Sequence, residues 1–227
     1  MGTHDGAVRT MPIARCLQVE LDEVARLLES AEDAEWRAPT ACPPWEVRHL
    51  VAHMVIDQTF SLRRLLPLTL PPASIPVTAR RAALRVGERK TRDQLLTSWQ
   101  AVAWGERPGA VNRLMSVTEQ FAEVAVHHAD LREALPRGGS ADPEVLAAAV
   151  AATVTLRRRV GFGGARMAEG LAFRATDADL RIGVGPEVRG GTHDLLLAVA
   201  GRPVADRLDG PGCAVLSRRL ARPLVDA

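Results

Sequence analysis

The chain has 227 residues and a formal net charge of +2, with 47% hydrophobic and 25% charged residues. These values are ordinary for a soluble globular protein of one or two domains that is large enough to bury a core. A near-neutral chain with no basic stripe is not expected to bind nucleic acid.

Signals for a membrane or for secretion are not evident in the sequence. No apolar run reaches the roughly 18 residues that span a bilayer, and residues 1–15 lack the apolar stretch of a signal peptide. Three widely spaced cysteines, Cys16, Cys42 and Cys213, do not suggest a disulfide framework. We therefore expect a cytoplasmic protein with no membrane partner.

The first two thirds of the sequence are typical of helices. Residues 13–30 carry apolar side chains close to a helical repeat. Because proline is tolerated in a first helical turn, Pro43 and Pro44 are expected to open a second helix. Its apolar face is formed by Val47, Leu50, Val51, Met54 and Val55. A polar stripe borders that face, made of His49, His53 and Asp57.

Two further helices are predicted, separated from the second by the proline-rich segment 66–76, which is expected to form a loop. Thr91 and Gln94 fit a capping box at the start of a helix that runs toward Trp104. The next helix is predicted over residues 117–135, with a polar stripe of Glu119, Glu123, His127 and Asp130. Four helices with such stripes turned inward can build a metal site inside a bundle.

The sequence changes character after residues 136–140. Asp142 and Pro143 are expected to begin a helix that continues to about residue 159 and ends at the glycines of 161–164. Strand-like runs follow at 171–176 and 180–184, and helices are expected over 192–201 and 214–220. The predicted fold class is α+β, with a helical bundle over 1–140 and a small α+β domain over 141–227.

Three residues are candidate metal ligands. Glu123 and His127 are four residues apart, so on a helix they lie one above the other on the same face. His53, in another predicted helix, can supply a third ligand from across the bundle. Two imidazoles and one carboxylate are a usual set for a catalytic divalent metal with an open coordination position. A Glu–His pair at this spacing is also common as a simple helix-surface contact, and that interpretation stays open.

Neighbouring side chains carry their own alternatives. His49 is four residues from His53, so it is either an additional ligand or a solvated or pocket-lining side chain. Asp130 is placed to steady His127 from outside the ligand set. His128 points away from His127 and is expected to pack on the apolar side of the helix. Cys42 is expected to be a small buried side chain and not a reactive thiol.

Several segments together resemble the mycothiol-dependent maleylpyruvate isomerase family, whose N-terminal half looks like a DinB-type four-helix bundle. They cover nearly the whole chain in the family's order. The matching segments are Trp36 with Pro39 and Thr40, CPPWEVRHLVAH over 42–53, EVAVHHAD over 123–130, LAFRATD over 171–177 and DLLLAVAGR over 194–202.

The resemblance implies that His53, Glu123 and His127 bind a divalent metal, usually zinc, and that Arg202 faces the cleft and contacts the substrate. It also implies a low-molecular-weight thiol cofactor, mycothiol, whose sulfur becomes nucleophilic near the metal. Some members isomerise a carbon–carbon double bond, whereas others transfer or cleave the thiol. Without the resemblance, Arg202 following Gly201 is equally well explained as a charge that stabilises a helix C-terminus.

The leading hypothesis is a metal- and mycothiol-dependent isomerase or S-transferase that acts on a small, carboxylated electrophile. A thiolate that adds to an activated double bond allows rotation about the resulting single bond and then leaves, which gives cis–trans isomerisation. Arg202 would pair with the substrate carboxylate and orient the alkene. Two alternatives remain open: a DinB-like metalloenzyme of a biosynthetic pathway that uses no thiol, and a non-catalytic, metal-stabilised binding module.

Overall fold

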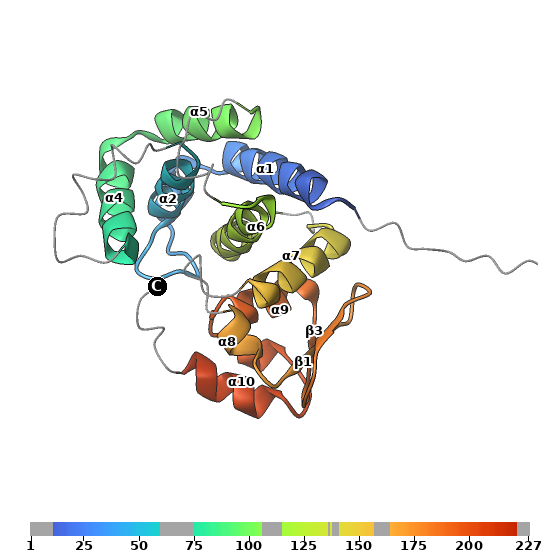
Figure 1. Cartoon of the computed structure of the whole chain (residues 1–227). Coiled ribbons are helices and arrows are strands. Elements are labelled where there is room, and N and C mark those ends of the chain that lie inside the picture. The colour runs from blue at the N-terminus through green and yellow to red at the C-terminus, as the bar shows by residue number, and fades with distance from the viewer. Residues whose placement is uncertain are drawn as a thin grey trace, which may run out of the picture.

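The computed structural model describes residues 11–59, 75–105, 115–135, 137, 141–156 and 164–221. The N-terminal part is a bundle of helices, drawn in blue to yellow-green in Figure 1. These helices are α1 (Ile13–Ser30), the short 3-10 helix η1 (Asp33–Arg37), α2 (Val47–Thr59), α4 (Ile75–Arg89), α5 (Arg92–Ala103) and α6 (Val117–Ala134).

The C-terminal part is a small α+β unit, so the predicted fold class is confirmed. Its helices are α7 (Pro143–Thr155), α8 (Gly164–Ala168), α9 (Thr192–Val199), the 3-10 helix η4 (Ala205–Arg207) and α10 (Cys213–Leu220). Its strands are β1 (Ala172–Ala175), β2 (Arg181–Gly183) and β3 (Glu187–Gly190). The strand order is β2-β1-β3, with β2 antiparallel and β3 parallel to β1. Phe173 lies at the centre, opposite Ile182 on one side and Val188 on the other.

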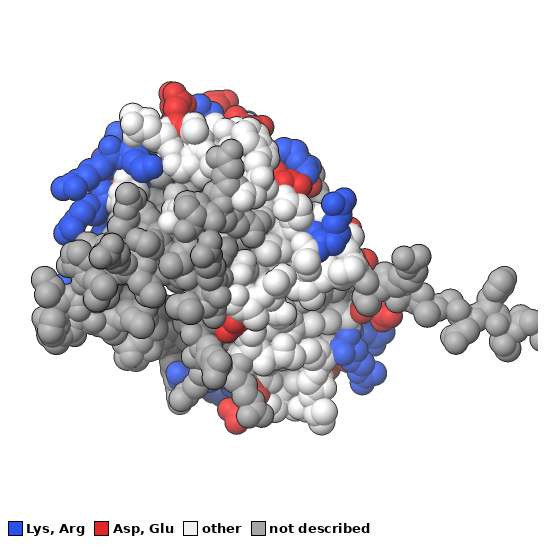
Figure 2. Space-filling view, turned by 45° about the horizontal axis from the view of Figure 1, so that its top comes forward, with Lys and Arg blue, Asp and Glu red and all other residues white. Residues whose placement is uncertain are grey.

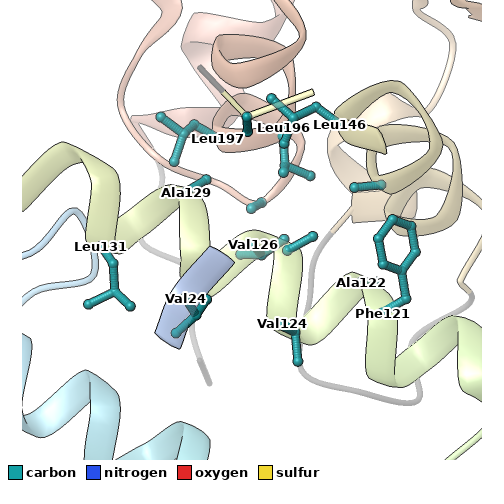
Figure 3. Close-up of a cluster of buried hydrophobic side chains, with 14 of the residues drawn as sticks. Val24, Phe121, Ala122, Val124, Val126, Ala129, Leu131, Leu146, Leu196 and Leu197 are labelled. Carbon is teal, nitrogen blue, oxygen red and sulfur yellow. The ribbon is translucent and has the colours of Figure 1, made fainter. Parts of the chain in front are cut away.

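Helix α6 lies at the centre of the molecule and is shared by both parts. It packs against α1 and α2 in the bundle and against α7 and α9 in the C-terminal unit. In Figure 3, Leu196 and Leu197 of α9 and Leu146 of α7 lie on the side of α6 that carries Ala129. One continuous apolar core therefore runs through both parts, and the division at residue 140 stays a prediction.

Most helix boundaries follow the sequence signals. α1 has the predicted bounds, and α5 begins with the predicted capping box of Thr91 and Gln94. α6 covers the predicted range except for its last residue and starts with a second capping box, of Ser116 and Glu119. These caps satisfy backbone N–H groups that have no partner within a first helical turn.

Pro43 and Pro44 do not open α2, which begins three residues later at Val47. The prolines lie in a turn whose two sides are held together, because the Thr40 N–H donates to the Trp45 carbonyl at 2.9 Å. The Thr40 hydroxyl donates to the same carbonyl oxygen, also at 2.9 Å. This turn fixes the position of Trp45 directly before α2.

The bundle also contains α4, which the sequence did not predict. Residues 66–74 of the expected loop lie outside the described residues, whereas Ile75 and Pro76 already belong to α4. Pro76 is in the first helical turn, where its missing N–H costs little. α4 packs along α2, with Gly87 so close to His49 that an added Cβ would lie 2.7 Å from its ring.

Two differences concern the C-terminal part. α7 ends at Thr155 and not near residue 159, and Gly164 begins α8 where the sequence suggested only a helix stop; residues 157–163 lie outside the described part. β3 was also not predicted, because its residues Glu187 and Arg189 break any apolar run. Its place in the sheet comes from pairing with β1.

The described surface shows no feature of a membrane-spanning helix and no basic stripe on the face of Figure 2. No helix within the described ranges is long and apolar enough to cross a membrane. On the face shown in Figure 2, the described basic residues lie in separate groups and form no continuous stripe.

Gly183 gives a test of the sheet packing. It has φ +86°, and a Cβ there would lie 2.2 Å from the Leu171 carbonyl oxygen. We expect Gly183→Ala to lower the free energy of unfolding by more than the ~1–2 kcal/mol that a left-handed backbone costs an ordinary residue, because the backbone at Leu171, directly before β1, must also shift. Gly170→Ala is the control, since Gly170 has φ +64° and no atom within 4 Å of the added Cβ. Equal losses in urea unfolding would contradict this packing.

Candidate metal centre

The three candidate ligands meet in the interior of the bundle, His53 on α2 and Glu123 with His127 on α6. One ligand atom from each residue lies within 4.8 Å of the other two. Glu123 Oε1 is 3.2 Å from His53 Nε2 and 3.1 Å from His127 Nε2. The two imidazole rings meet edge to face, with centroids 4.9 Å apart. The structure therefore brings together the set that the spacing suggested.

Helix geometry explains why these groups converge. Glu123 and His127 are one turn apart on α6, so their side chains project to the same side. α2 packs against that side and presents His53 to it. All three side chains are buried. Buried polar groups are costly unless they are paired, and these three groups pair with one another, so they do not form an exposed helix-surface contact.

Asp130 orients His127 from the next turn of α6. Its Oδ2 lies 3.0 Å from His127 Nδ1. A carboxylate at this position holds an imidazole proton on Nδ1, so that Nε2 is the ring nitrogen that faces Glu123 and is placed to bind a metal. This arrangement is typical of a metal-ligating histidine and confirms that Asp130 is close enough to steady His127.

The charges of the cluster are strongly coupled. Burial raises the pKa of Glu123, but its hydrogen bonds to His127 and His53 outweigh burial and bring that pKa to about 2. Burial likewise opposes the charge on His127, yet the hydrogen bonds to Asp130 and Glu123 raise its pKa to about 10. Without a metal, the positive charge of His127 therefore balances the Glu123 carboxylate, and a metal ion bound here would take the place of a proton.

Asp57 is a further member of the site. The sequence placed it on the polar stripe, but no role was assigned to it from the sequence alone. Its Oδ2 lies 3.4 Å from His53 Nε2. Burial raises the pKa of Asp57 to about 6; the positive charge of His53 opposes this rise, and the negative charge of Glu123 adds to it. The spacing of His53 and Asp57, one helical turn, was the signal that could have identified it.

Trp45 covers the site and was also not assigned a role from the sequence. Its ring centroid lies 4.7 Å from that of His53 and 6.4 Å from that of His127. Trp45 is buried, and its indole N–H has no hydrogen-bond partner among the described residues. The same is true of His53 Nδ1, so the His53 ring is positioned by packing against Trp45 and not by a hydrogen bond like that of His127.

Arg202, the residue expected to meet substrate, lies next to this cluster but is engaged with protein groups. Its Nε donates to Asp130 Oδ1 and its Nη2 to Asp130 Oδ2, both at 2.7 Å. Its Nη1 donates to the Ala200 carbonyl at 2.9 Å. The guanidinium has five N–H donors, and three of them are engaged by these partners among the described residues. Its contact with substrate stays a prediction.

His49 is not arranged as an additional ligand. Its Nδ1 accepts from the Glu46 N–H at 3.2 Å, so its Nε2 carries the proton and donates to Glu88 Oε1 at 3.0 Å. It is buried between α2 and α4 and is therefore not solvated. Both nitrogens serve the packing of these two helices.

His128 and Cys42 lie apart from the ligand set. His128 is buried on the other side of α6, as expected, where its Nδ1 is 2.6 Å from Glu20 Oε2 of α1. Cys42 is a free cysteine in the turn before α2, and it is half-buried there and not buried as expected. Its expected lack of reactivity stays a prediction.

The donor set fits a divalent metal. His53 Nε2, Glu123 Oε1 and His127 Nε2 converge on one point, the His127 ring is oriented by Asp130, and a second carboxylate, Asp57, lies beside them. Nitrogen and carboxylate ligands of this kind suit zinc and several other first-row ions. These residues are the candidate ligands.

Comparison with known proteins supports the fold. Residues 17–103 match the family model described as the mycothiol maleylpyruvate isomerase N-terminal domain. That segment includes His53, whereas Glu123 and His127 follow it. No curated protein sequence matches the chain significantly.

Two solved structures share the fold over most of the chain. They are a mycothiol-dependent maleylpyruvate isomerase and a histidine-to-alanine mutant of that protein. Each has a TM-score of 0.56 and 19% sequence identity, and the match covers 88% of this chain and 93% of the other. Residues 17–103 therefore match the mycothiol maleylpyruvate isomerase N-terminal domain, and most of the chain shares the fold of the solved isomerase.

Metal content provides a direct test of the ligand set. We expect about one zinc per chain in wild-type protein purified without a histidine tag, and loss of that zinc in His53→Ala and Glu123→Ala, because each variant removes one of three protein ligands. Mass spectrometry after zinc incubation and desalting measures it. His49→Ala is the matched control, one turn earlier on α2 and equally buried, and it should keep its zinc. Folded His53→Ala with full zinc content would exclude the site.

Proposed function

We propose that the protein is a metal- and mycothiol-dependent enzyme that isomerises, or transfers a thiol to, a small carboxylated electrophile. Its metal ligands are His53, Glu123 and His127, with zinc as the metal to test first. The observation that carries the proposal is the convergence of these three buried ligand atoms within 4.8 Å, in a chain whose N-terminal domain and fold are those of the family.

The ligand set has the properties that thiol activation requires. A divalent metal held by two neutral imidazoles and one carboxylate retains positive charge and an open coordination position, which lowers the pKa of a bound thiol toward neutral pH. His127 is fixed for this role by Asp130. Trp45 packs against both imidazoles and shields this side of the cluster from water, which strengthens electrostatic interactions inside the site.

Two side chains are placed to handle protons and charge near the ligands. Asp57 lies 3.4 Å from His53 Nε2, with its carboxyl group directed at the cluster, so it is within reach of a proton released there. Arg202 has two N–H donors beyond those engaged by Asp130 and Ala200. Those donors are suited to one oxygen of a substrate carboxylate, which would orient the electrophile.

Thiol binding can be tested without knowing the substrate. We expect mycothiol to bind the cobalt-substituted protein and to produce a sulfur-to-cobalt charge-transfer absorption band, because its thiolate would become a ligand of the metal. S-methyl mycothiol is the matched control: it keeps the rest of the molecule but cannot form a thiolate, so it should give no band. A cobalt spectrum unchanged by mycothiol would rule out the thiol in this role.

The reaction itself is tested with maleylpyruvate. We expect the zinc-loaded protein to catalyse its cis–trans isomerisation only when mycothiol is present, and Glu123→Gln to lose the activity because it removes a charged ligand. The absorbance of the substrate follows the reaction. Activity that persists without thiol would favour the thiol-independent metalloenzyme. A protein that zinc stabilises but that binds no thiol and acts on no substrate would favour the binding module.

A further inference from the structure

Asp130 is the most deeply buried charged group beside the candidate metal centre, with 0% of its surface exposed. Both of its oxygens are engaged. Oδ1 accepts from Arg202 Nε at 2.7 Å, whereas Oδ2 accepts from Arg202 Nη2 at 2.7 Å and faces His127 Nδ1 at 3.0 Å. The carboxylate therefore joins a guanidinium from the C-terminal unit to a candidate ligand in the bundle.

The position of Arg202 is fixed by the end of α9. Gly201 has φ +86°, a conformation that suits glycine and lets the chain turn back directly after the helix. The Arg202 N–H then donates to the Leu197 carbonyl at 2.9 Å, and Arg202 Nη1 donates to the Ala200 carbonyl at 2.9 Å. The backbone and the side chain of Arg202 are thus both held by α9. The guanidinium therefore has a fixed position beside Asp130.

We propose that Arg202 is a positioning residue of the metal centre: through Asp130 it fixes the orientation of His127. The C-terminal unit would in this way set the metal affinity of a site whose three ligands all come from the bundle. This inference rests on the metal site of the proposed function, and it is separate from any contact between Arg202 and substrate.

The energetic reason lies in the burial of Asp130. A fully buried carboxylate that loses its cationic partner is left uncompensated, which is strongly unfavourable. The side chain would then move toward water or other donors, and Oδ2 would leave His127 Nδ1. Loss of such an outer partner of a ligating histidine typically weakens metal binding about 10–100-fold. The effect is on metal affinity, which is measured with no substrate or thiol present.

The chain offers a matched control for the docking of the two parts. Arg207, in η4, also reaches α6, where its Nη1 and Nη2 donate to Glu133 Oε1 and Oε2 at 3.0 and 2.8 Å. This pair joins the same two parts of the molecule, and Glu133 is only three residues after Asp130. Glu133 also lies 3.0 Å from His193 Nε2, and His193 is not a candidate ligand. Removing the Arg207–Glu133 pair therefore tests only the packing of the two parts against each other.

The experiment compares zinc affinity in wild type, Arg202→Met, Arg202→Lys, Asp130→Asn and Arg207→Met by competition with a chromophoric chelator. We expect about 10–100-fold weaker binding in Arg202→Met and Asp130→Asn. Arg202→Lys should lie in between, because lysine keeps the charge but cannot bind both oxygens as a planar fork does. Arg207→Met should bind as wild type does. The ligand-field spectrum of cobalt-substituted Arg202→Met should also change, since His127 is reoriented.

Each outcome separates this inference from the proposed function. If wild type binds zinc and folded Arg202→Met binds it equally well, the inference is overturned and the metal site stands. If Arg202→Met does not fold, the zinc affinity of Arg202→Lys is compared with that of wild type, and equal affinity again overturns the inference. Equal weakening in Arg207→Met would overturn the inference in favour of general docking. A wild type that binds no zinc would overturn the proposed function, and this inference with it.

Discussion

Burial of charged side chains on one helix is the constraint on which the rest of the structure depends. α6 carries Glu123, His127, His128 and Asp130 into the interior, and each is at most 7% exposed. Unpaired polar groups at such depth cost several kcal/mol, so every one needs a partner from a neighbouring element. The partners are Glu20 of α1, His53 of α2 and Arg202 after α9. The polar groups of α6 thus determine which elements surround it. The apolar contacts of Figure 3 alone would not be specific enough to do so.

Local signals explain why the sequence predicted part of this arrangement. The four-residue spacing of Glu123 and His127 places them on one helix face whatever the rest of the fold. Capping residues such as Thr91 marked helix starts, because they satisfy backbone groups within four residues. His53 could be added because it lies on the polar stripe of a second predicted helix. These predictions depended only on residues close together in the sequence.

The elements that escaped prediction depend on distant contacts. Arg202 and Asp130 are joined although 72 residues separate them, and no periodicity relates them. β3 is a strand because β1 pairs with it, since its own residues are too polar to form an apolar run. α4 follows a proline-rich segment and is held against α2 at Gly87, a contact that no local pattern encodes. The role of Asp57 was within reach, because it is one turn from His53.

Stability alone does not account for the polar cluster. Replacing buried ion pairs by apolar side chains of similar volume is often neutral or even stabilising. A bundle whose core already contains Leu21, Leu50, Trp99 and Phe121 therefore does not require His53, Glu123 and His127 for its fold. The same residues gain a purpose when a cation binds them, because its charge compensates the carboxylate and its binding energy adds to the stability of the folded state. The fixed orientation of His127 has the same explanation, since a histidine that only packs has no need to present one particular nitrogen, whereas a metal ligand does.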